Sequence, residues 1–189
     1  MMSCHKPSAA VALVASIALW GSLAAGAGAA TVIGALRAPG VVWISDGSKP
    51  ATVSAEMRNT NKTFVPELLV VPAGSTVRFP NDDPFFHSIY AAGGADAFDL
   101  GFYGDGPGKD EILSAPGVLD VGCHIHQQMH AVIVVVDGPA MQTDDRSFIL
   151  ANVRPGNHQL HAWSAALGER TITVTVPSGH GILNLDRAF

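Results

Sequence analysis

Short apolar stretches separated by turn residues recur along most of the 189-residue chain. None of them carries the 3.6-residue apolar repeat of an amphipathic helix, and turn pairs such as Pro39-Gly40 and Asp46-Gly47 stand between them. Short apolar runs bounded by glycine, proline and aspartate are typical of an all-β protein. The predicted strands are residues 31–36, 41–45, 51–57, 68–71, 74–79, 87–90, 111–114, 118–121, 131–136, 147–153, 158–164, 170–176 and 181–185.

Residues 91–110 interrupt this pattern, because they contain six glycines and read as a loop. Four large side chains nevertheless stand among the glycines: Phe98, Leu100, Phe102 and Tyr103. A flexible linker would not carry so many of them. We therefore expect an ordered loop that packs on the rest of the protein.

The first thirty residues differ in composition from the rest. Lys6 is their only Lys or Arg, they contain no acid, and residues 9–23 are almost wholly apolar. Small residues with the A-x-A spacing follow between Ala25 and Ala29. This layout predicts a secretory signal peptide over residues 1–30, and with it a periplasmic or secreted protein that keeps no membrane insertion after cleavage. An uncleaved anchor is the alternative, but the stretch is weak in Leu and Ile and rich in Gly.

Removal of that peptide would also remove Cys4 and leave Cys123 as the single cysteine. Exported proteins normally pair their cysteines, so a lone thiol is accidental, intermolecular or a metal ligand. A buried, metal-bound thiolate is protected from oxidation, and this interpretation fits best. Without Lys6 the chain has 10 basic against 16 acidic residues, a net charge of −6, and no basic cluster. This composition argues against nucleic acid as a partner.

The sequence CHIHQQM places Cys123, His126 and Met129 at the spacing C-x2-H-x2-M between two predicted strands. Thiolate, imidazole and thioether together suit copper, which can be bound by two His, one Cys and a weak axial Met. A second His is therefore needed. His87 is the candidate, since it follows a polar turn and opens a strand. In a Greek-key sandwich this turn lies at the same end as the CHIHQQM loop.

Two separated motifs resemble the cupredoxin (blue copper) family, and amicyanin and plastocyanin-like members most. The segment FVPELLVVPAGSTVRFPNDDPFFHSIY is similar to that family's first His region, with Asn81 six residues before His87, and the C-x2-H-x2-M spacing is similar to the amicyanin ligand loop. The stretches FDLGFY, PGVLDVGCHIHQQM and TDDRSFILANVRPGNHQLHAW are also similar to exported methylamine-utilisation-like proteins. The resemblance covers most of the chain after the signal peptide. It implies a Greek-key β-sandwich and one copper ion, Cu(I) or Cu(II), held by His87, Cys123, His126 and Met129.

The ligand loop departs from the family's pattern at two positions, since Gln127 stands where Pro is common and His124 follows the cysteine. His130 also follows Met129 directly, which brings the imidazoles of this region to three. These departures leave open whether Met129 is a true axial ligand and whether a second, looser metal site lies nearby. Asn81 and His124 are the candidates for hydrogen bonding around the ligands, Asn81 by tying the His87 turn to the cysteine loop.

Phe85 and Phe86 immediately precede the candidate ligand His87. Adjacent residues of a strand point to opposite faces, so we expect at least one of the two rings at the surface. Together with Gln127 they would form a weakly charged docking patch around the exposed edge of His126.

The chain is predicted to hold two domains after the signal peptide. Residues 51–138 would form the cupredoxin domain. The four strands of residues 139–189 would bury too little apolar surface alone. They resemble a small regulatory, transthyretin-like β-domain, and we expect residues 31–50 to complete it, so that the cupredoxin domain is inserted.

These features favour a type 1 copper protein that carries single electrons in the periplasm between redox partners. It would be a monomer and, by itself, not an enzyme. Two other functions remain open. One is a copper chaperone or storage protein, suggested by His124 and His130, and the other is an extracellular binding module whose cupredoxin fold is only structural.

Overall fold

The computed structural model describes residues 28–179 and 181–185, which form seventeen strands. These described residues contain no helix, so none of them offers a helix able to span a membrane. The predicted all-β class is therefore confirmed. Residues 1–27 of the predicted signal peptide lie outside the described residues.

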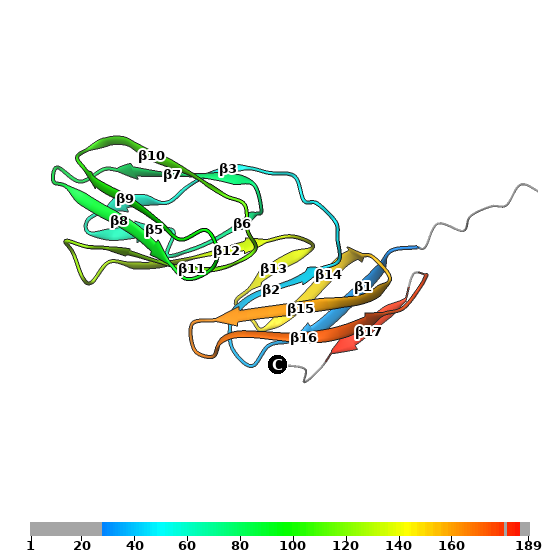
Figure 1. The fold of residues 1–189 in the computed structure, drawn as a ribbon. Coiled ribbons are helices and arrows are strands. Elements are labelled where there is room, and N and C mark those ends of the chain that lie inside the picture. Colours follow the sequence, from blue (N-terminus) through cyan, green and yellow to red (C-terminus); the bar gives the residue numbers. More distant parts are fainter. Residues whose placement is uncertain (1–27, 180, 186–189) are drawn as a thin grey trace, which may run out of the picture.

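Two sheets form a first β-sandwich from the middle of the chain (Figure 1). One sheet has the order β10-β7-β4-β5 with β3 also paired to β7, and the other has the order β6-β12-β11-β8-β9. Non-consecutive neighbours show that the chain crosses between the sheets, as the predicted Greek-key sandwich requires. The strands are β3 (Ser54–Glu56), β4 (Arg58–Thr60), β5 (Thr63–Val65), β6 (Leu68–Pro72), β7 (Ser75–Asn81), β8 (His87–Ala92), β9 (Phe98–Tyr103), β10 (Gly106–Leu113), β11 (Gly117–Cys123) and β12 (His130–Val136).

Alternating side chains of the two sheets fill the core of this first sandwich. Val77 and Phe79 of β7 belong to the same buried cluster as Leu119 and Val121 of β11, while Arg78 on the other face of β7 is exposed. Cys123 continues the inward-facing series of β11 and belongs to the same core. The alternation of inward- and outward-facing side chains along β11 therefore places Cys123 inside the sandwich, at the end of the strand.

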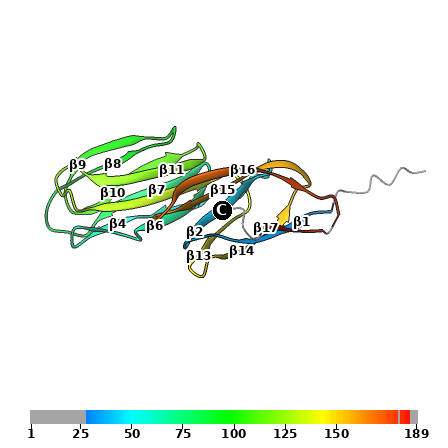
Figure 2. The same ribbon diagram turned by 90° about the horizontal axis from the view of Figure 1, so that it is seen from below.

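A second sandwich joins the first strands of the chain to the last ones (Figure 2). Its sheets have the orders β14-β1-β17 and β13-β2-β15-β16, and their facing side chains form a separate core. The strands are β1 (Ala30–Ala35), β2 (Gly40–Ser45), β13 (Ala140–Thr143), β14 (Ser147–Val153), β15 (Gly156–Ser164), β16 (Gly168–Val176) and β17 (Ile182–Leu185). The predicted division of the chain into two domains stays a prediction.

Strand β12 is buried on both faces, which accounts for its continuous β-branched run. Ile133 and Val135 point into the core of the first sandwich. Val134 points the other way, into a third apolar cluster shared with Trp43 of β2 and Trp163 of β15. Because a strand covered on both faces has no polar side, it reads as uninterrupted apolar sequence.

Residues 91–110 were predicted to be a loop, and this prediction is wrong over most of its length. Residues 98–103 form β9 and β10 begins at Gly106. Gly108 is needed inside the sheet, because a Cβ there would lie 1.8 Å from the carbonyl oxygen of Phe79 on β7. The short strands β4, β5 and β13 were not predicted either.

The two ends of the first sandwich have different surroundings. The connections from β2 to β3 and from β12 to β13 join it to the second sandwich at one end (Figure 1). The connections from β7 to β8 and from β11 to β12 lie at the other end, away from the second sandwich (Figure 1). Both ligand motifs of the sequence therefore fall at the free end.

Candidate metal centre

His87 and Cys123 are brought together by the pairing of their strands. His87 is the first residue of β8, Cys123 is the last of β11, and the two strands are antiparallel neighbours with Cys123 opposite Ile89. The loop of residues 124–129 then folds back, with the Met129 N–H donating to the His126 carbonyl at 2.9 Å. This turn places the His126 ring beside the other two side chains.

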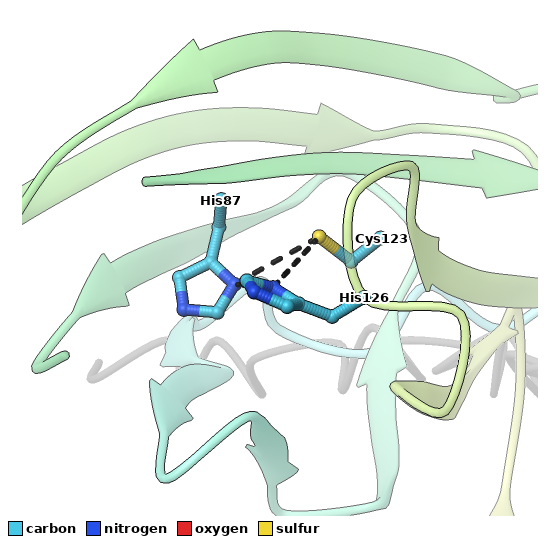
Figure 3. A group of neighbouring side chains, drawn as sticks. All are labelled: His87, Cys123 and His126. Atoms are coloured by element: carbon cyan, nitrogen blue, oxygen red, sulfur yellow. Dashed lines mark hydrogen bonds between the residues drawn. The ribbon is translucent and has the colours of Figure 1, made fainter. Parts of the chain in front are cut away.

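Three donor atoms converge on one point (Figure 3). Cys123 Sγ lies 3.8 Å from His87 Nδ1 and 3.8 Å from His126 Nδ1, and the two Nδ1 atoms are 3.3 Å apart. Metal bonds of about 2.0 Å to nitrogen and 2.3 Å to sulfur would separate trigonal donors by about 3.5 to 3.7 Å. The three side chains therefore fit a metal ion held by two imidazoles and a thiolate.

Burial differs among these three side chains. His87 is fully buried and Cys123 is 4% exposed, while His126 is partly exposed. Burial lowers the pKa of His126, and the nearby His87 and Lys62 lower it further. A lowered pKa keeps the imidazole neutral, which is the form that binds metal.

Phe85 covers the outer side of the two histidines. Its ring centroid lies 5.4 Å from that of His87 and 5.5 Å from that of His126. Lys62 Nζ stands 5.1 Å from the Phe85 centroid. Phe86 points outward and is 62% exposed, and Gln127 is exposed as well. Their part in docking stays a prediction.

Met129 is 3% exposed and packs in the same core cluster as Cys123. This burial is compatible with the predicted axial thioether ligand and equally with core packing. The ligand role of Met129 stays a prediction.

Asn81 shapes the turn before His87 rather than bridging to the cysteine loop. Its side-chain oxygen accepts from Asp83 N at 2.9 Å, and its Nδ2 donates to the Phe85 carbonyl at 2.8 Å. The bridge comes from Ser88, whose N–H lies 3.5 Å from Cys123 Sγ and whose carbonyl accepts from His124 N at 2.9 Å. Ser88 takes part through its backbone alone, so the pattern of side chains in the sequence could not predict this bridge.

Asp83 is a further contact of the site that the sequence did not single out. The residue is 4% exposed, and its Oδ2 lies 3.0 Å from His87 Nε2. Burial works to raise the pKa of Asp83. Backbone N–H groups of Lys62 and Asn61, together with His87, outweigh burial and hold that pKa below its usual value. Asp83 is therefore a carboxylate.

Tyr103 flanks His87 on the neighbouring strand, directly opposite it in the β8–β9 pair. Its hydroxyl accepts from Asn59 Nδ2 at 3.0 Å, and burial raises its pKa to about 12. The phenol is therefore neutral. Because residues 91–110 were taken for a loop, this neighbour of the site was missed.

Comparison with known proteins gives matches among solved structures only. No family model and no curated protein matches the chain. A copper-containing nitrite reductase from Thermus scotoductus SA-01 is 26% identical with a TM-score of 0.41; the match covers 46% of this chain and only 23% of that protein's length. A purple cupredoxin from Nitrosopumilus maritimus is 20% identical with a TM-score of 0.39, over 43% of this chain and 98% of that one. A reduced amicyanin variant is 21% identical with a TM-score of 0.40, over 43% and 81%.

Cupredoxins are therefore among the structural neighbours of this chain, as the ligand motifs predicted. Each of these matches covers less than half of the present chain.

The additional histidines of the loop, His124 and His130, lie outside the group of three donors. The His124 ring stacks on Tyr90 with centroids 4.4 Å apart, and its Nε2 lies 3.1 Å from Asp99. His130 Nε2 lies 3.8 Å from Asp120. Within residues 28–179 and 181–185, the only group of three or more His, Cys, Asp or Glu side chains placed to hold a metal is that of His87, Cys123 and His126.

Proposed function

We propose that this protein is a type 1 copper protein that carries single electrons between redox partners. The observation that carries the proposal is the convergence of Cys123 Sγ, His87 Nδ1 and His126 Nδ1 at separations of 3.3 to 3.8 Å. Bound copper would supply one electron at a time by cycling between Cu(I) and Cu(II). The donor set would be that of a blue-copper centre, and Met129 would offer its thioether to the same ion.

The chain's own part is to hold these donors still and to keep water away from them. His87 and Cys123 sit on adjacent strands, joined beside the site by the Ser88 backbone. Because the donors are positioned before any metal binds, a change of oxidation state requires little rearrangement. With Met129 as the fourth donor, copper would be held by protein groups alone, which favours a carrier over an enzyme.

The partly exposed edge of His126 is the proposed route for electrons. Exposed apolar side chains belong to the same segments as the ligands: Ile125 (42%) precedes His126, Phe86 (62%) precedes His87, and Phe102 (69%) lies opposite Ser88. Apolar surface of this kind suits brief contact with a redox partner protein, which we propose docks here. We further propose that the protein is exported, because of its amino-terminal sequence, and acts as a monomer.

Copper titration of the metal-free protein tests this function. Cu(II) should give an intense visible thiolate-to-copper band in the wild type and in His124→Ala, whose ring stacks away from the site. Cys123→Ala should lose the band. Tight Cu(I) binding without the band would favour a chaperone instead. Absence of stoichiometric copper binding would contradict both functions and leave a binding module.

A further inference from the structure

A cavity of about 240 Å³ opens at one end of the second sandwich. Trp163 near the end of β15 lies opposite Val41 near the start of β2, so the β1–β2 turn and the β15–β16 hairpin meet at this end. The cavity is lined by residues 36–38 of the turn and by residues 162–164, 167, 168 and 170 of the hairpin. None of the proposed copper ligands lines it, so the cavity is separate from the metal centre.

The inner part of the cavity is apolar. Leu36 and Ala162 are 7% and 6% exposed and belong to the core of the second sandwich. Leu167 lines the cavity as well and is exposed. A closed apolar cavity of about 150 Å³ is large enough for one benzene molecule. The volume here therefore suits an aromatic ring, or a short aliphatic chain, that carries a small polar head.

Two guanidinium groups make the mouth of the cavity positive. Arg37 and Arg170 both line it and both are exposed, and no Asp or Glu is among the described residues that line it. Arg170 lies opposite Ala162 in the β15–β16 pair. Opposite residues share a face of the sheet, so the Arg170 side chain leaves the strand on the side of the core and the cavity. The chain as a whole has a net charge of −5, so the positive charge is local.

The hairpin side of the cavity is fixed by contacts of its own. Ser164 is buried, and its Oγ accepts from the Leu167 N–H at 3.1 Å, which closes the turn. At the start of β2, a Cβ on Gly40 would lie 2.0 Å from the Trp163 carbonyl oxygen, so the two strands approach closely. Because the walls are formed in advance, little ordering would be required when a ligand binds.

We propose that this cavity binds a small organic carboxylate with an apolar body. The body occupies the interior beside Leu36 and Ala162, and the carboxylate faces the guanidinium groups of Arg37 and Arg170 at the mouth. Guanidinium and carboxylate form paired, charge-assisted hydrogen bonds, which are stronger than bonds between neutral groups. The inference goes beyond the proposed electron transfer and does not depend on it. It assigns a small-molecule site to the second sandwich.

NMR titration of the isotope-labelled, metal-free full chain tests the proposal, with phenylacetate as the test compound. Saturable shifts are expected at the backbone amides of residues 36–38 and 162–170. Acetate has the charge without the apolar body, and phenylacetamide has the body without the charge. Each should bind at least about tenfold more weakly than phenylacetate, since one kind of contact is lost. Equal affinity for phenylacetamide, or no saturable shift at these amides, would overturn the proposal.

Three variants locate the two kinds of contact. Arg170→Gln should weaken phenylacetate binding about tenfold, because a charge-assisted hydrogen bond is lost. Ala38→Phe should abolish binding, because the larger side chain fills the cavity. Arg154→Gln is the matched control and should bind as the wild type does, because Arg154 is exposed and precedes β15 at its other end. Wild-type affinity in a folded Arg170→Gln protein would refute the role of the guanidinium. The comparison of the three compounds in the wild type decides the proposal even if a substitution disturbs the fold.

Discussion

Substitution of Trp43 tests how much the contact between the two sandwiches contributes to the stability of the protein. Trp43 lies on β2, is 1% exposed, and packs in the same cluster as Val134 of β12. Among the described residues its Nε1–H has no hydrogen-bond partner. Burial of an unpaired polar group costs about 1–3 kcal/mol. The apolar area that Trp43 buries therefore stabilises the contact between the two sandwiches, and its unpaired N–H group destabilises it.

Two substitutions separate these contributions. Trp43→Ala removes the whole ring and should lower the free energy of unfolding by about 3–5 kcal/mol. Trp43→Phe loses on the order of 40 Å² of buried area, which at about 25 cal/mol per Å² costs about 1 kcal/mol. It also removes the unpaired N–H, which returns about 1–3 kcal/mol. We expect the Phe variant within about 1–2 kcal/mol of the wild type.

Guanidinium unfolding of the full chain, followed by circular dichroism, gives both differences from the midpoint and slope. Trp163→Phe is the matched control, because Trp163 lies in the same layer, is partly exposed, and has no orphaned N–H group. The visible copper band should not change in any variant, since the Cys123 loop is at the other end of the first sandwich. A Trp43→Phe protein as unstable as Trp43→Ala would refute the reasoning.

Three further outcomes are expected. A fragment of residues 51–138 should bind copper but self-associate, because it exposes the β12 face that contains Val134. Val134→Thr should reduce the self-association of this fragment. In the full chain the same substitution should lower the free energy of unfolding by about 1–3 kcal/mol. Light scattering and unfolding curves would show this, and a soluble monomeric fragment without the substitution would contradict it. Burial lowers the pKa of His161, so the stability it contributes is complete above about pH 6.5 and is lost as pH falls through the folded-state pKa. Metal-free His161→Gln should therefore lose less stability than the wild type between about pH 7.5 and 5.5, and equal losses would exclude this contribution. Phe86→Ser should leave stability within about 0.5 kcal/mol but slow electron self-exchange measured by NMR, and an unchanged rate would remove Phe86 from the docking face.

The sequence predicted the parts of the site that have a chemical signature. Cys123, His126 and His87 were placed by donor chemistry, spacing and resemblance, and the structure brings them together. Asp83 was not singled out by the sequence. Its hydrogen bonds from the Asn61 and Lys62 backbone are ordinary for an acid in a turn, but those donors belong to a hairpin more than twenty positions earlier, and the contact with His87 appears only in the folded chain.

Strands were predicted correctly where apolar and polar residues alternate. They were missed where a glycine lies inside a strand and resembles a turn signal. Gly108 reads as a turn signal, yet it lies within a strand because β7 passes too close for a Cβ. The strands β4 and β5 have three residues each, too few for a periodic pattern. The apolar run of β12 was identified as a strand, but a run alone cannot show what covers its second face.

The β11–β12 connection has a consequence for variation among related chains. Residues 124–129 join two strands whose positions are set by side chains farther along, in two separate cores. Met129 packs in the first core, whereas residues 124–128 lie outside both cores, so the frame does not depend on the chemistry of these five positions. Exchange of residues 124–128 would alter the proposed copper centre while leaving the scaffold intact, so that new redox behaviour could arise by substitution in one short segment.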